Sequence, residues 1–151
     1  MTDTKNRTEV SMGGFKETEI GPLPAEWEVG QLGQVVVYRK GRKPEILQDR
    51  LQQGSLPYLT ANYFRTGTAS QFVPRREIQR NVVCRASDVV LIWDGSNAGD
   101  VFIGLEGIVA STMVMVTPIS PQEVDGQWVY FFLKTQFEKL NCQTQDRLYL
   151  T

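Results

Sequence analysis

The sequence predicts an α+β fold, with a mixed or antiparallel sheet, open or barrel-like, and an amphipathic helix near the C-terminus. Two observations lead to this fold class. Residues 88–116 contain three short apolar runs separated by two glycine-rich turns, a pattern typical of antiparallel strands. Residues 127–140 carry apolar side chains at helical spacing. A chain of 151 residues is long enough for one domain with its own core.

The first part of the chain is expected to be a leader followed by an extended segment. Residues 1–18 lack hydrophobic periodicity and are predicted to be a flexible leader, and residues 19–151 the domain. Pro22 and Pro24 restrict the backbone at its start to an extended form. One helical turn is then expected near residues 31–35, and a β-branched run predicts a strand over 35–38.

The next segment is polar and broken by glycine and proline. Residues 39–44 hold four basic side chains around Gly41 and before Pro44, so we expect a loop there. Residues 45–53 are interpreted as a short helix that ends at Gly54. The remaining expectations are strands at 56–60 and 70–73, a turn at Gly67 after residues 62–65, and a polar loop or single helical turn over 74–81.

The central stretch predicts strands at 89–93, 101–103 and 108–116. Residues 94–100 between the first two contain Asp-Gly and Asn-Ala-Gly, which favour tight turns with positive φ. We expect an exposed polar loop there, held by rigid strands, and such loops commonly carry binding groups. The final predicted helix, 127–140, is interpreted as a core helix whose apolar stripe covers one face of the sheet. That stripe comprises Val129, Phe132, Leu133, Phe137 and Leu140.

Charge is unevenly distributed along the chain. Ten basic residues and three acidic residues lie between Arg39 and Arg85, a net charge of +7, whereas the whole chain carries −1. Gathered on one face, these side chains would suit a phosphate backbone. Scattered over the surface, they would only solvate the protein. The sequence alone leaves both alternatives open.

Several classes of catalytic and metal site are absent from the sequence. Histidine does not occur, which excludes Ser-His and Cys-His nucleophile pairs within this chain. No G-x-G and no phosphate-binding G-x-x-x-x-G-K-[ST] motif is present, so no cofactor is expected. Asp88, Asp94 and Asp100 are regularly spaced, but aspartate at strand ends usually serves turns rather than metal ions. The sequence therefore favours a non-catalytic binding module.

The two cysteines, Cys84 and Cys142, are far apart and form no C-x-x-C zinc motif. They are consistent with a reducing cytoplasm, where a cysteine acts as a small apolar residue. No apolar run approaches the roughly 20 residues that span a bilayer, and the polar N-terminus does not resemble a secretory signal. We therefore expect a cytoplasmic protein without a membrane partner.

Residues 20–27 read IGPLPAEW, 32–35 read LGQV and 41–44 read GRKP. In this order, they resemble the start of a target recognition domain from the DNA specificity (S) subunit of type I restriction–modification systems. That family commonly begins with I-G-x-(I/L)-P-x-x-W, then L-G-x-x and a G-K-x-P-like turn. Its second hallmark, a strand and glycine turn before a strand with small and hydroxyl residues, resembles LIWDGSNAG at 91–99 and GIVAST at 107–112. The late helix with YFFL at 130–133 is similar to the family's Y-x-x-x-x-L helix.

The resemblance implies a subunit that binds one half of a bipartite DNA target and neither cuts nor methylates it. Methylation and cleavage would come from the methyltransferase (M) and restriction (R) subunits. It also implies that this chain stops before the first spacer helix and lacks the second recognition domain. The chain would then be a fragment or a half-subunit, which could pair with a second recognition domain or with another copy of itself.

Our first hypothesis is sequence-specific binding of double-stranded DNA. Basic side chains are expected to contact phosphates, and these are Lys40, Arg42, Lys43, Arg75 and Arg76. Base edges would be read by Asn62, Arg65 and Asn97, with Tyr63 and Ser96 assisting. For Asn97 the alternative is a purely backbone role in its glycine turn. Two alternatives remain for the whole chain: a protein-interaction module whose basic face meets an acidic partner, and a ligand-binding domain with an accidental match to the glycine turn.

Overall fold

The computed structural model describes residues 13–136, and the chain divides into two compact units, Met1–Gln34 and Val35–Thr151. The first unit contains an antiparallel hairpin of β1 (Phe15–Thr18) and β2 (Gly21–Pro24). Its turn is closed by the Thr18 hydroxyl, which donates to the Gly21 carbonyl oxygen at 2.6 Å. Strand β1 lies within residues 1–18, where we expected a leader. The strand was not predicted, because its pairing with the proline-containing β2 is not visible in the local sequence.

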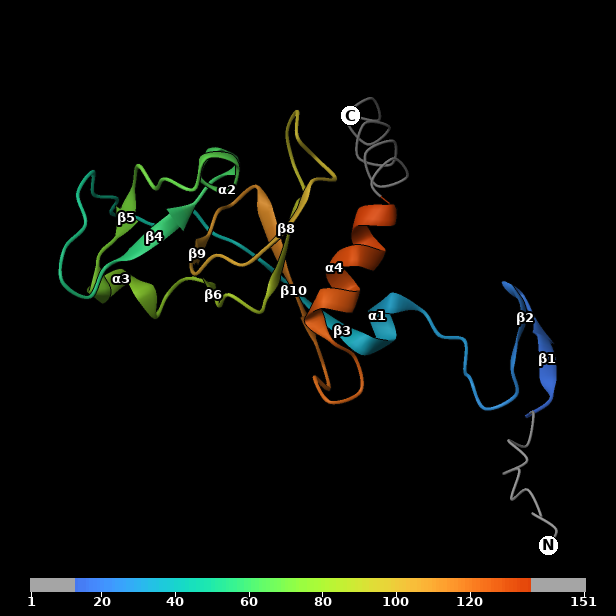
Figure 1. The fold of residues 1–151 in the computed structure, drawn as a ribbon. Coiled ribbons are helices and arrows are strands. Elements are labelled where there is room, and N and C mark those ends of the chain that lie inside the picture. The colour runs from blue at the N-terminus through green and yellow to red at the C-terminus, as the bar shows by residue number, and fades with distance from the viewer. Residues whose placement is uncertain (1–12, 137–151) are drawn as a thin grey trace, which may run out of the picture. The chain divides into compact units, whose positions relative to one another are not determined.

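The second unit begins where α1 (Leu32–Val35) leads into β3 (Val36–Lys40). Its first sheet joins β3 to β7 (Val89–Ile92), β8 (Val101–Ile103) and β10 (Met113–Pro118). The strand order is β3-β10-β7-β8, and all neighbours are antiparallel. Figure 1 shows β3, β8 and β10 of this sheet, with α4 (Gly126–Thr135) beside β8. Strand β7 is buried along its whole length, as its unbroken apolar sequence predicts.

The second sheet contains β4 (Leu56–Leu59), β5 (Phe72–Val73), β6 (Val83–Cys84) and β9 (Gly107–Val109). Its order is β5-β4-β9-β6, with β4 and β9 parallel and the other pairs antiparallel. The prediction of an α+β fold with mixed and antiparallel strands is confirmed. The barrel-like alternative is wrong, because within the described residues each sheet is open and has two edge strands.

One hydrophobic core joins the two sheets. Leu59, Val73 and Ile108 of the second sheet belong to the same buried cluster as Val90 and Met113 of the first. Burying side chains of this size stabilises the fold by roughly 1.5–3 kcal/mol each relative to exposure. The loops that leave the two sheets are therefore attached to a single rigid body, which fixes their positions relative to each other.

Helix α4 (Gly126–Thr135) covers part of the first sheet and packs against β7 and β8. Asp125 caps its N-terminus by accepting a hydrogen bond from the Gln127 amide at 2.8 Å. Val129 and Leu133 are buried, as expected for a core helix, whereas Phe132 is 37% exposed. Phe137 and Leu140, which we also placed in the stripe, lie outside the described residues.

Two short helices complete the second unit. Helix α2 (Ala61–Thr66) begins after Thr60, whose hydroxyl accepts from the Tyr63 amide at 3.2 Å, and ends at Gly67 with φ 71°. We expected only a turn there, although a threonine cap and a following glycine are the usual signals of a helix. Helix α3 (Arg75–Ile78) is the single helical turn predicted within residues 74–81.

Three local predictions are wrong. Residues 108–116 form two strands in different sheets, because a turn at 110–113 separates β9 from β10. Residues 45–53 form no helix, and Gln48 instead pairs with Phe72 in a β-bridge. The basic loop is shorter than 39–44, since Arg39 and Lys40 continue β3.

Candidate nucleic-acid interface

The turn between β7 and β8, residues 94–100, is named the hairpin loop here. Gly95 and Gly99 have φ of 98° and 96°, which side chains other than glycine rarely adopt. Two backbone hydrogen bonds close the loop. The Gly99 amide donates to the Ile92 carbonyl oxygen at 2.8 Å, and the Ile92 amide donates to the Asp100 carbonyl oxygen at 2.9 Å. Ala98 is buried while Asp94 and Ser96 are exposed. The prediction of an exposed polar loop is therefore confirmed for residues 94–96, whereas residues 97–100 are half-buried or buried and anchor the loop.

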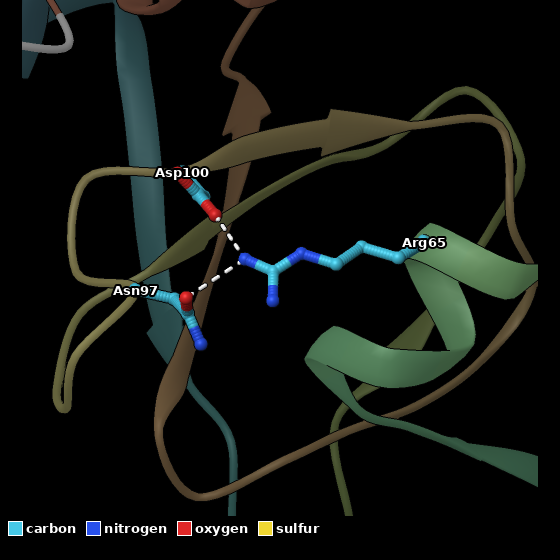
Figure 2. A network of polar contacts seen from close by, with 3 residues as sticks. All are labelled: Arg65, Asn97 and Asp100. Atoms are coloured by element: carbon cyan, nitrogen blue, oxygen red, sulfur yellow. Dashed lines mark hydrogen bonds and ion pairs between the residues drawn. The ribbon is translucent and has the colours of Figure 1, made fainter.

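Arg65 of α2 is bound to this loop (Figure 2). Its Nη2 lies 2.8 Å from Oδ2 of Asp100 and 2.8 Å from Oδ1 of Asn97. Both contacts use the same nitrogen, so the N–H groups on Nε and Nη1 take no part in them. The side chain of Arg65 is 50% exposed. One end of a planar guanidinium is thus held by the protein while the group still reaches the surface.

An aromatic contact fixes α2 beside the hairpin loop. Phe64 stacks on Phe102 of β8, with ring centroids 4.4 Å apart and planes 15° from parallel. Such a pair contributes about 0.5–1.5 kcal/mol beyond the area it buries. Phe64 and Arg65 are neighbours in sequence, and Phe102 and Asp100 lie on the same hairpin. The apolar contact therefore sets the distance across which the ion pair forms.

Lys40, at the end of β3, contacts the other end of the hairpin loop. Its Nζ lies 3.1 Å from Oδ2 of Asp94, and both side chains are more than half exposed. An exposed pair of this kind adds at most about 1 kcal/mol to stability. The pair matters for position, because it places the hairpin loop between Lys40 and Arg65. Both belong to the ten basic residues between Arg39 and Arg85.

The structure brings together Lys40, Arg65, Ser96 and Asn97 from the predicted set. The carbonyl oxygen of Asn97 accepts from the Asp100 amide at 3.1 Å in the turn, and its side-chain oxygen accepts from Arg65. Its reading of a base edge stays a prediction. Asn62 is exposed on α2. Tyr63 is half-buried and packs against the core, which limits it as a base-reading group.

Arg42 and Lys43 line a separate hollow of about 410 Å³ beside α3, named the α3 hollow here. Arg80 also lines it, and so do the carboxylates of Glu45 and Glu77. Glu45 lies 3.8 Å from Nη1 of Arg80, and Glu77 is 5% exposed. Three cations face two acidic groups, so the positive potential here is weaker than the sequence count indicates.

Arg75 and Arg76 lie on α3 itself and are exposed. Helix α2 follows the C-terminal end of β4, whereas the side chain of Arg75 lies against Gly54, just before that strand. Helices α2 and α3 therefore lie at opposite ends of β4 (Figure 1). Of the basic side chains predicted to contact DNA, Lys40 and Arg65 thus lie at the hairpin loop, and the others lie around α3: Arg42, Lys43, Arg75 and Arg76. The local sequence does not predict this division, because it follows from the antiparallel pairing of β4 and β5, after which α2 and α3 begin at opposite ends.

The three aspartates of the central stretch serve different purposes. Asp88 caps a turn, accepting a hydrogen bond from the Arg85 amide at 2.9 Å, as expected. Asp94 and Asp100 instead pair with Lys40 and Arg65. Their role as ion-pair partners was missed, although they are the only acids in the predicted loop and lie beside a strongly basic segment. Among residues 13–136, no cluster of acidic or cysteine side chains could hold a metal ion.

Cys84 is free and 1% exposed. Burial, followed by the nearby carboxylates of Asp88 and Glu106, raises the pKa of its thiol to about 12. Cys84 therefore stays protonated and acts as a core residue. Within residues 13–136, no helix combines the length and apolar character needed to cross a bilayer.

Comparisons with known proteins agree on one family. The family model described as type I restriction modification DNA specificity domain matches residues 24–148. The specificity subunit of the type I restriction enzyme MjaVIII of Methanocaldococcus jannaschii is 37% identical over 131 residues, which cover 87% of this chain and 30% of that protein. The crystal structure of the HsdS subunit from Thermoanaerobacter tengcongensis superposes with a TM-score of 0.63 at 16% identity, covering 84% of this chain and 32% of that one.

These comparisons cover most of this chain but only about a third of either relative. The structural likeness, at low identity, concerns the fold. The family model and the archaeal relative concern the sequence as well, and both name a specificity subunit or domain. This chain belongs to the family of type I restriction modification DNA specificity domains.

Proposed function

We propose that this domain binds double-stranded DNA sequence-specifically and reads one half of a bipartite target within a type I restriction–modification system. The observation that carries the proposal is the hairpin loop held between Lys40 and Arg65. An arginine that is fixed at one end and exposed at the other suits bidentate recognition of guanine in the major groove. Ser96 and Asn97 supply further polar groups on the loop, and Asn62 supplies an exposed amide on α2.

Phosphate contacts would come from both basic groups. Lys40 lies beside the hairpin loop, whereas Arg42, Lys43, Arg75 and Arg76 surround α3. Contacts with phosphates position a protein on the duplex and carry no sequence information themselves. The domain is proposed to be non-catalytic, with methylation and cleavage performed by M and R subunits. A cytoplasmic location agrees with the free thiol of Cys84.

Fluorescence anisotropy with a labelled random-sequence duplex, read across a salt series, tests the proposal. Non-specific binding of this kind has a Kd of roughly 10⁻⁴–10⁻⁶ M at physiological salt and tightens as salt falls. We expect saturable binding at low salt that unlabelled duplex competes away. No saturable binding at low salt would contradict the proposal and favour an acidic protein partner.

A double substitution tests whether the basic residues of the α3 hollow contact phosphates. Replacing Arg42 and Lys43 by alanine removes two expected phosphate contacts, so the slope of log K against log salt should become less steep by about 1.8, at about 0.9 per contact. An unchanged slope would remove both residues from the interface. Lys16→Ala serves as the control, because Lys16 is an exposed lysine that the proposal does not assign to the interface.

A further inference from the structure

We propose that a hollow beside the hairpin loop takes a phosphate group of the DNA backbone, with Lys134 and Tyr130 of α4 as contact residues in addition to Arg65. The inference rests on the proposed function and extends the interface to α4, which lies outside the basic residues 39–85. The hollow measures about 480 Å³ and is named the α4 hollow here. It is lined by Arg65, Asp100, Val101, Phe102, Tyr130 and Lys134.

The α4 hollow combines groups that suit a sugar-phosphate unit. Lys134 and Arg65 approach it from two different helices, α4 and α2, with β8 between them. Nζ of Lys134 lies 3.3 Å from the Tyr130 hydroxyl and 5.5 Å from the centroid of its ring. These contacts direct the ammonium and the hydroxyl to the same place, where both can donate to an anionic oxygen.

The charge of the α4 hollow favours an anion. Among the described lining residues, Asp100 is the one acidic side chain, and its carboxylate is already paired with Nη2 of Arg65 at 2.8 Å. Two cations therefore face one carboxylate that has a partner. Val101 and Phe102 form an apolar wall, which suits the deoxyribose that accompanies each phosphate in a strand.

The α4 hollow is continuous with the hairpin loop. Asp100 and Arg65 belong to both: their ion pair fixes the far end of the loop, and the same side chains line the hollow. A DNA strand whose bases meet the hairpin loop thus has its backbone within reach of Lys134. Phosphate contacts are independent of sequence, so this site can be tested without knowledge of the target.

The test is anisotropy with a labelled random-sequence duplex over a salt series, comparing the full chain with Lys134→Gln, Tyr130→Phe and Lys16→Gln. Lys134 is exposed, so its replacement removes charge without disturbing the core. Lys134→Gln should weaken binding several-fold and reduce the salt slope by about 1, as loss of one phosphate contact does. Tyr130→Phe should weaken binding without changing the slope, because it removes a neutral donor. Lys16→Gln, which makes the same charge change on β1, should leave the slope unchanged.

Three results would overturn the inference while the proposed function stands. The first is a wild-type slope for Lys134→Gln, and the second is an equal loss of slope for Lys16→Gln, which would indicate a general charge effect. The third is an unchanged affinity of Tyr130→Phe, which would remove the hydroxyl from the site. If the wild-type chain does not bind the duplex at low salt, the proposed function and this inference fail together.

Discussion

Arg65 and Asp100 are 35 residues apart in sequence, and Nη2 of Arg65 lies 2.8 Å from Oδ2 of Asp100. The arginine side chain is half exposed, so the ion pair adds at most about 1 kcal/mol to stability. A free arginine side chain has about 2 kcal/mol of rotamer entropy to lose when it is ordered on a ligand. Because Asp100 and Asn97 hold the guanidinium in advance, we interpret this contact as one that positions Arg65.

Asp100→Asn should separate positioning from stability. The free energy of unfolding should change by less than about 1 kcal/mol, since the pair is partly exposed. Selection from a randomised duplex pool should yield a weaker consensus at the position that Arg65 reads, because the guanidinium is held less firmly. Overall affinity for random duplex should rise slightly, as one negative charge is removed. The matched control is Asp49→Asn, at an exposed aspartate outside both hollows. An unchanged consensus for Asp100→Asn would show that the ion pair does not position a reading group.

Gly41 is required where the chain leaves β3 towards Arg42 and Lys43. A Cβ atom at this position would overlap the carbonyl oxygens of Val109 and Ala110, which belong to backbone that cannot easily move. Gly41→Ala should therefore lower the free energy of unfolding by about 1–3 kcal/mol or more, measured by urea denaturation. Gly33→Ala is the control, because nothing lies within 4 Å of the added atom. Equal stability of the two variants would show that the backbone of Val109 and Ala110 leaves room for a Cβ atom at position 41.

The thiol of Cys84 should be unreactive in the folded protein. In a Cys142→Ser background, alkylation by iodoacetamide at pH 8–9 should be negligible in the native state and complete in denaturant. Burial raises the pKa of Cys84 from 9.0 to about 12, so the folded protein keeps a proton that the unfolded chain releases above pH 9. Its contribution to stability is therefore complete below pH 9 and is lost as the pH rises towards 12. Rapid stoichiometric alkylation of the native protein at pH 8 would contradict the burial of this residue.

The fold class and most strands could be predicted because their signals are local. The apolar run at 89–92 and the glycine turn after it are visible in any short window. The split of residues 108–116 could not be predicted, since no glycine or proline marks the turn at 110–113. Strand β9 turns away because β4 and β6 provide backbone partners for it in the second sheet. Pairing between distant strands thus decided what the local pattern left open.

Only those parts of the candidate site that have local sequence signals could be predicted. The hairpin loop and Arg65 follow from turn residues and charge. Their meeting does not, because it depends on Phe64 stacking on Phe102, a contact between residues 38 positions apart that only the folded sheets bring together. The contact now proposed for Lys134 was not among the predictions, because this residue lies outside residues 39–85 and within a helix interpreted only as core.

DNA is proposed to lie on the hairpin loop. The direct measurement is photo-crosslinking from a benzophenone attached at Ser96→Cys, in a Cys142→Ser background, with the buried Cys84 left in place. Gln122→Cys carries the control probe. Gln122 follows the C-terminal end of β10, whereas the hairpin loop lies beside Thr112 at the opposite end of that strand.

Irradiation in the presence of labelled duplex should crosslink the Ser96 conjugate to DNA, with a yield that falls as salt or competitor duplex is added, and should leave the Gln122 conjugate largely free. A crosslink from Gln122 equal to or greater than that from Ser96, or none from Ser96 under conditions where the duplex is bound, would contradict the claim that the hairpin loop contacts DNA.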